Sequence, residues 1–434
     1  MNFAPVFAGQ RFAVLGLGRA GLPAAWALRE MGADIFVWDD SASAREAAGA
    51  EGFTITCPSE VAGRLDGLVL SPGIPHKLPK PHEQAAWAVA HGVPVFTDAE
   101  LLYRAVRGSG SRAKFAGITG TNGKSTTTAL LAHICAVAGV PHAAGANLGP
   151  AALSLPLLPD HGVYVLEMSS YMLERIVTLR FDAAAMLNLS PDHLDRHGDM
   201  AGYAAAKREI FARQTAGDVA VVGIDDAPSR QMAAWLRGRP ARVVEISGKN
   251  FEVHGAKALP GAHNAQNAAA AAALAKALGI PDAAIAEGIK TYPGLPHRQQ
   301  QVAVVQGVRF INDSKATNAD AASRAMECYD RFVWIAGGVG KAGGIEELAP
   351  LFPRVAKAFL IGRDAEIFAA TLARHGVAHE IVRTLDAAVT ASFALARTEG
   401  VQDILFSPAA ASFDQFQNFE QRGAHFAELA RELA

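Results

Sequence analysis

The chain has 434 residues, more than one ordinary hydrophobic core accommodates, so we expect roughly two to four domains. With 50% hydrophobic residues, 19% charged residues and a net charge of -2, the composition excludes an intrinsically disordered chain and argues against nucleic acid as a partner. The three cysteines are far apart, which excludes a disulfide framework. Neither a signal peptide nor a run of about 20 apolar residues is visible, so we predict a soluble cytoplasmic protein without membrane insertion.

A βαβ unit is predicted at the start of the chain. The apolar run Phe12–Leu15 leads into the glycine pattern GxGxxG, which ends at Gly21. A second run, Asp34–Trp38, is followed by Asp39. This order is typical of half a Rossmann-like domain, with a diphosphate at a helix N-terminus and the acid near a ribose hydroxyl. NAD and a nucleotide-diphosphate sugar fit the pattern equally well.

A third apolar run, Gly67–Leu70, ends in the turn Ser71–Ile74. Open α/β sheets bind their ligands at the carboxyl ends of the strands. We therefore expect this turn to lie at the same ligand-binding edge as the glycine pattern.

The segment from Gly117 to Thr128 indicates an ATP site. An apolar strand from Lys114 to Ile118 runs into a glycine-rich turn and then into a helix containing Gly-Lys-Ser-Thr. In a P-loop, the turn amides and the lysine bind phosphate oxygens and the serine hydroxyl binds Mg²⁺. The strict Walker pattern is not met, because Ile118 stands where its first glycine should be.

Polar residues follow the two strands that come next. Glu167, after the strand Val163–Leu166, could hold Mg²⁺, or its segment could simply begin a helix. Asn188–His197, after the strand Ala183–Leu189, could bind a metal or form a solvated turn, and imidazole suits transition metals better than Mg²⁺. Lys207 lies on a predicted helix, Tyr203–Phe211, where lysine is usually a solvated charge.

Further polar groups follow in the last part of the chain. Asn264 and Asn267 share one face of the alanine-rich helix Asn264–Leu278. Arg298 stands at a domain junction, where it could clamp an anion. The turns Asn312–Asn318 and Ser407–Asp414 each follow a strand, and either a structural or a binding role fits them.

Together these segments resemble the Mur ligases of peptidoglycan synthesis, and most closely the members that add D-glutamate to UDP-N-acetylmuramoyl-L-alanine. The offset phosphate-binding loop is the form that this family uses. The resemblance covers essentially the whole chain and keeps its motifs in order: GLGRAGL, SPGI, GITGTNGKST, LEMSSYMLE, NLSPDHLDRH, YAAAKREI, GAHNAQNAAAA, GLPHR, NDSKATN and SPAAASFDQFQNFEQRG. It departs from familiar versions at Val339, Phe413 and Arg19-Ala20.

The resemblance implies an ATP-dependent acid–amino-acid ligase with an acyl-phosphate intermediate, a pair of Mg²⁺ ions and a lysine carbamylated by CO₂. By motif, the family's catalytic residues match Lys124, His193, Lys207 and Arg298. Its ATP contacts match Gly120, Thr121, Asn122, Gly123, Lys124, Ser125, Thr126, Asn264, Asn267, Arg298 and Asp313. Its metal ligands match Ser125, Glu167, His193 and carbamylated Lys207. Its UDP-sugar contacts match Gly18, Arg19, Ala20, Asp39, Ser71, Gly73, Asn147 and His193. Its D-glutamate contacts match Lys315, Thr317, Lys341, Ser412 and Phe419.

The predicted fold is α/β with three domains. We expect a Rossmann-like UDP-sugar-binding domain at residues 1–97, a central P-loop ATPase-like domain with a parallel sheet at 98–294, and a C-terminal Rossmann-like domain for the amino-acid substrate at 295–434. We expect a monomer. The alternatives are an NAD-dependent dehydrogenase or sensor, a nucleotide-binding module without ligase activity and, among ligases, a folylpolyglutamate synthase. The sequence alone gives no basis for choosing D- over L-glutamate.

Overall fold

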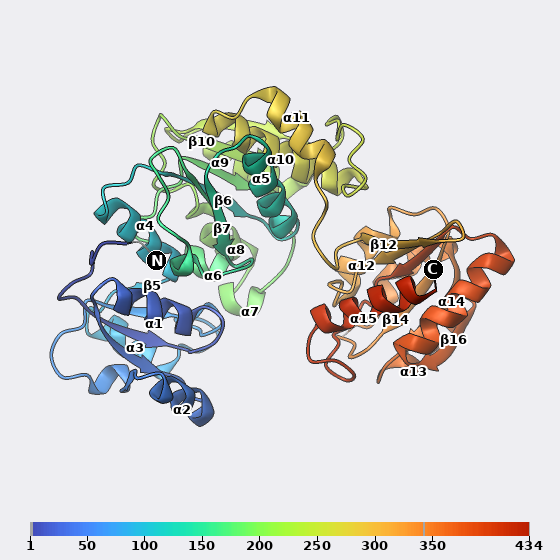
Figure 1. The fold of residues 1–434 in the computed structure, drawn as a ribbon, viewed down its shortest axis with the longest axis horizontal. Helices are drawn as coiled ribbons and strands as arrows, with labels where there is room; N and C mark the ends of the chain where they lie inside the picture. Colours follow the sequence, from blue (N-terminus) through green and yellow to red (C-terminus); the bar gives the residue numbers. More distant parts are fainter. Residues whose placement is uncertain (1–2, 342, 434) are drawn as a thin grey trace. The chain divides into compact units, whose positions relative to one another are not determined.

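The computed structural model describes residues 3–341 and 343–433. The chain divides into two compact units (Figure 1). The first unit comprises Met1–Ala256 and Ala262–Tyr292, and the second comprises Lys257–Gly261 and Pro293–Ala434. The first unit carries two sheets and the second carries one.

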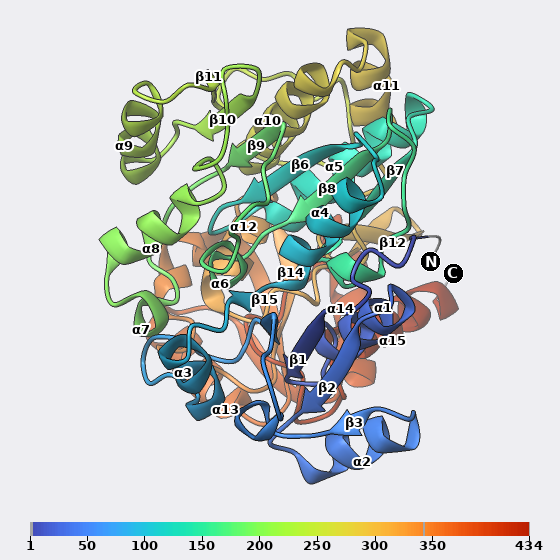
Figure 2. The ribbon, with the colours of Figure 1, turned by 90° about the vertical axis from the view of Figure 1, so that its left-hand side faces the viewer.

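The first sheet has five parallel strands in the order β3-β2-β1-β4-β5. Its strands are β1 (Arg11–Leu15), β2 (Asp34–Trp38), β3 (Thr54–Ile55), β4 (Gly67–Leu70) and β5 (Val95–Phe96), with helices α1 (Gly21–Glu30), α2 (Ala42–Ala50), α3 (Glu83–Ala90) and the short η1 (Pro58–Glu60). Figure 2 shows β1 and β2 side by side near α1. Every residue of β4 is buried, which explains its unbroken apolar sequence.

The second sheet has six parallel strands in the order β11-β10-β9-β6-β8-β7. Its strands are β6 (Lys114–Thr119), β7 (His142–Ala146), β8 (Val163–Glu167), β9 (Ala183–Met186), β10 (Val219–Gly223) and β11 (Arg242–Ile246). The helices are α4 (Asp98–Gly108), α5 (Lys124–Val137), η2 (Ala152–Ser154), α6 (Ser170–Leu173), α7 (Leu194–His197), α8 (Met200–Arg208), α9 (Ala227–Leu236), α10 (Ala262–Leu278) and α11 (Asp282–Thr291). Because β8, β6 and β9 are adjacent and parallel, the three loops that follow them emerge at one edge.

Helices α10 and α11 pack against α5, the helix that follows the phosphate-binding loop. Small residues make this possible. Residues Ala268 to Ala271 of α10 are all buried, and a Cβ added at Gly288 of α11 would lie 2.8 Å from Ile134 of α5. The alanine-rich sequence of α10 therefore belongs to the core of the first unit.

The sheet of the second unit has the order β12-β13-β17-β14-β15-β16, and only β12 runs antiparallel to its neighbour. Its strands are β12 (Gln300–Val305), β13 (Val308–Asn312), β14 (Phe332–Gly337), β15 (Val355–Ile361), β16 (His379–Arg383) and β17 (Asp403–Phe406). The helices are α12 (Ala319–Met326), η3 (Glu346–Arg354), α13 (Ala365–Arg374), α14 (Leu385–Glu399) and α15 (Phe419–Glu432). Gln306 and Gly307 join β12 to β13 with positive φ angles, as a tight hairpin requires.

The predicted α/β class with parallel sheets is confirmed. The predicted strand Ala183–Leu189 ends earlier, at Met186, because Leu187 to Ser190 leave the sheet to contact the phosphate-binding loop. The predicted helix Tyr203–Phe211 runs instead from Met200 to Arg208, capped by the Asp199 side chain. The units divide after Tyr292, close to the predicted boundary at 294, while the three domain ranges stay predictions.

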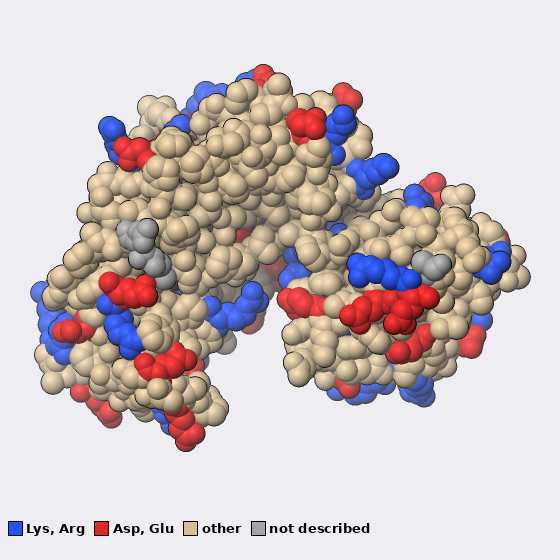
Figure 3. All heavy atoms as spheres, in the orientation of Figure 1, with Lys and Arg blue, Asp and Glu red and all other residues tan. Residues whose placement is uncertain are grey.

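Positive and negative side chains are interspersed over the face drawn in Figure 3, in keeping with the net charge of -2. In the part of the chain that the structure describes, no helix is both long enough and apolar enough to cross a membrane.

Candidate active site

The predicted phosphate-binding loop, residues 120–123, joins β6 to α5, and its conformation strongly favours glycine at the last position. Gly123 is the N-cap of α5 and has φ of 83°, in the left-handed region. A Cβ at this position would overlap the side-chain amide of Asn267 on α10. Only glycine meets both conditions.

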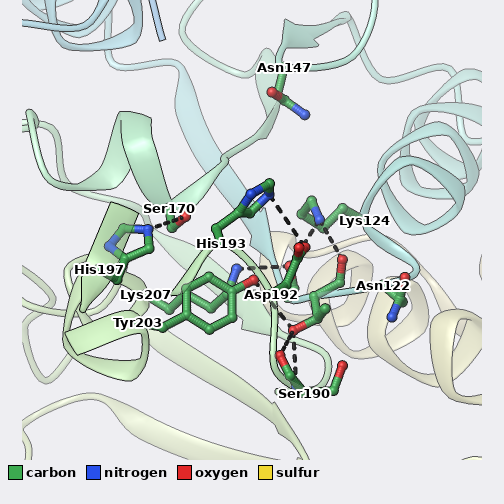
Figure 4. Close-up of polar contacts among 12 residues, drawn as sticks. Asn122, Lys124, Asn147, Ser170, Ser190, Asp192, His193, His197, Tyr203 and Lys207 are labelled. Atoms are coloured by element: carbon green, nitrogen blue, oxygen red, sulfur yellow. Dashed lines mark hydrogen bonds and ion pairs between the residues drawn. The ribbon is translucent and has the colours of Figure 1, made fainter. Parts of the chain in front are cut away.

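Lys124 and Ser125 open helix α5, where backbone N–H groups give the helix end a partial positive charge. The Lys124 Nζ donates to the carbonyl oxygens of Gly120, at 2.9 Å, and Thr121, at 2.7 Å (Figure 4). Ser125 is buried. The ammonium group therefore lies over the loop, and the arrangement can bind phosphate.

The loop after β9 holds the phosphate-binding loop in shape. The Asn188 Oδ1 accepts from the Asn122 N–H at 2.8 Å, and its Nδ2 donates to the Asn122 carbonyl at 3.1 Å. Thr121 Oγ1 donates to the Ser190 carbonyl at 3.2 Å and accepts from the Ser190 N–H at 3.0 Å. The polar residues at 188–190 thus have a structural role that sequence reasoning did not assign.

Lys207 of α8 is buried, with 1% of its surface exposed. Its Nζ donates to the Gly120 carbonyl at 2.8 Å and to Thr119 Oγ1 at 3.3 Å, and lies 4.6 Å from the centre of the Tyr203 ring. Burial and the nearby Lys124 ammonium hold the pKa of Lys207 well below its usual value. The structure therefore gives an amine that sheds its proton readily, next to the phosphate-binding loop.

Glu167 ends β8 and is buried. Its Oε1 accepts from Asn147 Nδ2 at 2.6 Å, whereas its Oε2 has no hydrogen-bond partner among the described residues. Two residues on, the Ser169 side chain accepts from the Met172 N–H and caps α6. The segment therefore begins a helix, as one of the two interpretations of the sequence expected. The Glu167 Oε2, which has no partner among the described residues, is compatible with the other interpretation, a metal ligand.

His193 lies at the start of α7 with φ of 53°, and its side chain is 46% exposed. Its Nε2 lies 3.3 Å from an Asp192 oxygen, and burial on one side lowers the pKa of the imidazole. Within residues 3–341 and 343–433, no three His, Cys, Asp or Glu side chains converge as a metal site would require. Of the four predicted metal ligands only Glu167 and His193 are of these residue types, so the prediction does not require three of them to converge.

The first unit also holds a cavity of about 560 Å³ at the carboxyl end of the first sheet. It is lined by seven of the eight residues predicted to contact a UDP-sugar: Gly18, Arg19, Ala20, Asp39, Ser71, Gly73 and Asn147. His193, the eighth, is not part of its lining. The Asp39 carboxylate accepts from the Leu17 N–H at 2.7 Å, so it fixes the glycine turn.

Two arginines that sequence reasoning missed connect this cavity to the second sheet. Arg175 is buried and donates to the Leu70 carbonyl at 2.7 Å, and Arg196 donates to the Gly73 carbonyl at 3.0 Å. Glu174 lies between two histidines, 3.6 Å from His197 and 4.0 Å from His76. No motif signal marks these contacts, because they join segments about a hundred residues apart.

Asn264 and Asn267 are buried near the start of α10, and the Asn267 Nδ2 donates to the Asn264 Oδ1 at 3.1 Å. The predicted shared face is therefore confirmed. Since Asn267 also touches Gly123, the two amides adjoin the phosphate-binding loop.

In the second unit, Asp313 is buried at the end of β13. It accepts from Ser407 Oγ at 2.7 Å and from the Gln299 N–H at 3.2 Å. Burial nevertheless raises the pKa of this carboxyl to about 7. Arg298 precedes Gln299 in the same turn, so these two predicted nucleotide contacts lie close in the chain.

The residues predicted for D-glutamate come from three loops and one helix of the second unit. Lys315 Nζ lies 4.0 Å from the centre of the Phe419 ring, and Ser412 is buried. Val339 and Ala411 form a backbone bridge that joins the loop carrying Lys341 to the loop carrying Ser412. Val339, one of the sequence departures, contributes its backbone to this bridge. Phe413, another, is 74% exposed.

Comparisons with known proteins agree over the whole chain. The Mur ligase middle domain matches residues 118–275, and the Mur ligase glutamate ligase domain matches residues 297–409. The chain is 47% identical to a UDP-N-acetylmuramoylalanine–D-glutamate ligase of Paramagnetospirillum magneticum, over 99% of this chain and 98% of that protein. It is also 47% identical to the protein of that name in Caulobacter vibrioides, over 97% and 95%.

Among solved structures, the fold is similar to that of the UDP-N-acetylmuramate–alanine ligase of Thermotoga maritima. The TM-score is 0.58 at 17% identity, covering 98% of this chain and 100% of that one. A UDP-N-acetylmuramoylalanyl-D-glutamyl-2,6-diaminopimelate–D-alanyl-D-alanyl ligase of Acinetobacter baumannii gives a TM-score of 0.56 at 19% identity, covering 78% of this chain and 80% of that one. With its phosphate-binding loop at a parallel sheet edge and relatives matching along its full length, this chain belongs to the Mur ligase family, whose members perform ATP-dependent ligation of peptidoglycan precursors.

Proposed function

We propose that this protein joins D-glutamate to UDP-N-acetylmuramoyl-L-alanine in a reaction driven by ATP. The observation that carries the proposal is the full-length identity of 47% to proteins named for this activity. Three features of the geometry support it: the glycine-rich loop beside Lys124, the cavity at the first sheet, and the joined loops of Val339 and Ala411 in the second unit. We propose one of the three substrates for each.

In the proposed mechanism, a carboxylate oxygen of the alanine attacks the γ-phosphorus of ATP, and the bond to ADP breaks. The amine of D-glutamate then attacks the carbonyl carbon of the acyl phosphate, the amine loses a proton, and inorganic phosphate leaves as the amide forms. Because two anions must approach each other, the Lys124 ammonium and the α5 N-terminus would offset their repulsion. Arg298 would neutralise phosphate charge as well.

Mg²⁺ fits the residues at the carboxyl end of β8 and β6. The unpaired, buried Glu167 Oε2 is the kind of hard oxygen ligand that Mg²⁺ prefers, and Ser125 is buried beside the loop. We propose that Ser125, Glu167, His193 and carbamylated Lys207 contribute to holding a pair of Mg²⁺ ions. When bound, Mg²⁺ would neutralise the developing charge on the phosphate oxygens.

The carbamate on Lys207 is proposed because its amine is buried and readily neutral. Only the neutral amine can attack CO₂, and the product is a carboxylate. The nitrogen loses a proton as the N–C bond forms, so an anion takes the place of a neutral amine beside the phosphate-binding loop. Our Mg²⁺ proposal needs that anion, since Glu167 is the one buried carboxylate at this edge within residues 3–341 and 343–433.

The cavity at the first sheet is proposed as the site of the UDP-linked sugar, with contacts from Gly18, Arg19, Ala20, Asp39, Ser71, Gly73 and Asn147. D-glutamate is proposed to bind Lys315, Thr317, Lys341, Ser412 and Phe419. ATP is proposed to contact residues 120–126, Asn264, Asn267, Arg298 and Asp313. We further propose that the protein acts in the cytoplasm as a monomer, in three functional domains spanning residues 1–97, 98–294 and 295–434.

One coupled assay tests the proposal. ADP release should require both UDP-N-acetylmuramoyl-L-alanine and D-glutamate, and replacing D-glutamate by L-glutamate should abolish it. Activity with a pteroylglutamate in place of the UDP-linked substrate would favour a folylpolyglutamate synthase. Nicotinamide reduction without ATP would favour a dehydrogenase, and ATP binding without any ligation would favour a binding module.

A further inference from the structure

A buried arginine at the start of α15 links the loops of the second unit that carry the predicted glutamate contacts. Only 1% of the surface of Arg422 is exposed. Its Nε donates to Ser314 Oγ at 3.0 Å, and its Nη2 donates to the Ser314 carbonyl at 2.8 Å and to the Ala410 carbonyl at 3.0 Å. One guanidinium group thus ties the loop after β13 to the loop after β17.

The loop after β14 packs against the same guanidinium group. A Cβ at Gly338 would lie 3.2 Å from Arg422 Nη1 and would overlap the Ala411 carbonyl. Gly338 also has φ of 133°, which disfavours other residues. Backbone bonds between Val339 and Ala411, at 2.8 and 2.9 Å, complete the contact between these two loops.

Each loop held in this way carries a predicted glutamate contact close to the point of attachment. Lys315 follows Ser314, Ser412 lies two residues after Ala410, and Lys341 lies three residues after Gly338. Phe419 precedes Arg422 by three residues on α15, and its carbonyl accepts from Ser314 Oγ at 2.9 Å. The guanidinium group therefore sets the relative positions of these four residues.

Packing alone does not explain a cation here. No carboxylate lies within ion-pair distance of Arg422 among the described residues, and its Nη1 is buried without a hydrogen-bond partner there. A buried, unpaired charge is destabilising compared with an apolar side chain of similar volume. The planar guanidinium group instead supplies rigidly arranged N–H donors, which bind two carbonyl oxygens and a hydroxyl oxygen, together with a positive charge.

From this geometry we infer that Arg422 is a positioning residue for the amino dicarboxylate substrate, fixing the three loops that bind it. This rests on the proposed function, because the substrate is taken from it. The positive charge of Arg422 adds to that of Lys315 and Lys341 around a substrate with two carboxylates. Arg422 acts through the loops and need not touch the substrate.

The test is a kinetic comparison of Arg422→Lys with wild type. Lysine keeps the charge but lacks the fork, so the KM for D-glutamate should rise by about 10-fold or more, as expected for losing hydrogen bonds from a charged group. The KM for UDP-N-acetylmuramoyl-L-alanine, whose proposed contacts lie in the first unit, should stay within about 2-fold of the wild-type value under the same reasoning. Arg431→Met, an exposed arginine on the same helix, is the matched control and should change neither.

Ser314→Ala and Gly338→Ala change the residues that Arg422 contacts and leave the arginine itself in place. Both should raise the KM for D-glutamate without raising the KM for UDP-N-acetylmuramoyl-L-alanine. If circular dichroism shows that Arg422→Lys does not fold, the KM values of Ser314→Ala and Gly338→Ala test the inference in its place. An unchanged KM for D-glutamate in the folded variants, or an equal rise for both substrates, would overturn the inference. If wild type itself shows no glutamate-dependent ADP release, it is the proposed function that fails.

Discussion

At the scale of single residues, Lys207 has its amine buried beside the phosphate-binding loop. We expect Lys207→Ala to lose about 100-fold or more of its turnover, because a charge stabilising the transition state is removed. Added formate or acetate should restore part of the activity by supplying a carboxylate. The urea midpoint should hardly fall in Lys207→Met, since a buried amine is exchanged for an apolar chain of similar length.

Lys249→Ala, which removes an exposed lysine of the same unit, is the control and should keep full activity. A fully active Lys207→Ala variant, or one that carboxylic acids fail to rescue, would contradict the carbamate.

His76 provides a stability switch at acid pH. Burial, together with Arg175 and other nearby cations, lowers the pKa of His76 to about 3. The unfolded chain takes up this proton below about pH 6.5 and the folded chain does not, so stability is complete above that pH and falls as the pH drops towards 3, by up to about 1.4 kcal/mol per pH unit. The urea midpoint of wild type should therefore fall more between pH 7 and pH 5 than that of His76→Gln.

His161→Gln, an exposed histidine in the same unit, is the comparison and should keep the wild-type pH dependence. Parallel pH profiles for wild type and His76→Gln would show that His76 is not the group responsible.

At the scale of elements, the phosphate-binding loop depends on the loop that follows β9. Both hydrogen bonds of the Asn188 side chain go to the backbone of Asn122. Asn188→Ala removes both hydrogen bonds and lets the loop relax, so we expect the KM for ATP to rise by about 10-fold. Initial rates at varied ATP measure this, with the exposed Asn250→Ala as control. A KM for ATP equal to that of wild type would mean that the loop is rigid without this support.

Elements with local signals were predictable from the sequence. The strands at Asp34–Trp38, Gly67–Leu70 and Val163–Glu167 were found because apolar runs end at glycine, turn or acidic residues. For β9 the sequence predicts a strand that is too long, since Leu187 and Leu189 are as apolar as the strand itself. Strands such as β16, with half-buried polar residues at a sheet edge, give no clear periodic signal.

The site was predictable where a motif brings its residues within a few positions of one another. The cavity-lining residues around the first glycine turn and Ser71 were named from the sequence, and so were Asn264 and Asn267. The roles of Arg175, Arg196 and Arg422 are not predictable in this way, because the carbonyl groups of Leu70, Gly73 and Ser314 that they bind lie about a hundred residues away in the sequence. Such roles depend on the tertiary fold, which no local pattern encodes.

At the scale of the molecule, the two units should respond to different ligands. Hydrogen–deuterium exchange should slow around Gly16–Gly21 and Ser71–Ile74 when the UDP-linked substrate binds, because bound ligand orders the backbone it touches. D-glutamate should instead slow exchange in the second unit, at residues 312–318 and 407–422. Protection of the second unit by the UDP-linked substrate alone, or of the cavity by D-glutamate alone, would contradict the assignment.

The packing of α10 against α5 also has a consequence for how the chain acquires its structure during synthesis. Helix α5 ends at Val137, but the helix that covers it begins only at Ala262, 262 − 137 = 125 residues later. At about 5–20 residues per second, the ribosome needs roughly 6–25 seconds to add that stretch. Throughout that interval the helix of the phosphate-binding loop lacks its covering layer. The nascent first unit therefore completes this packing only after nearly two thirds of the protein has been made.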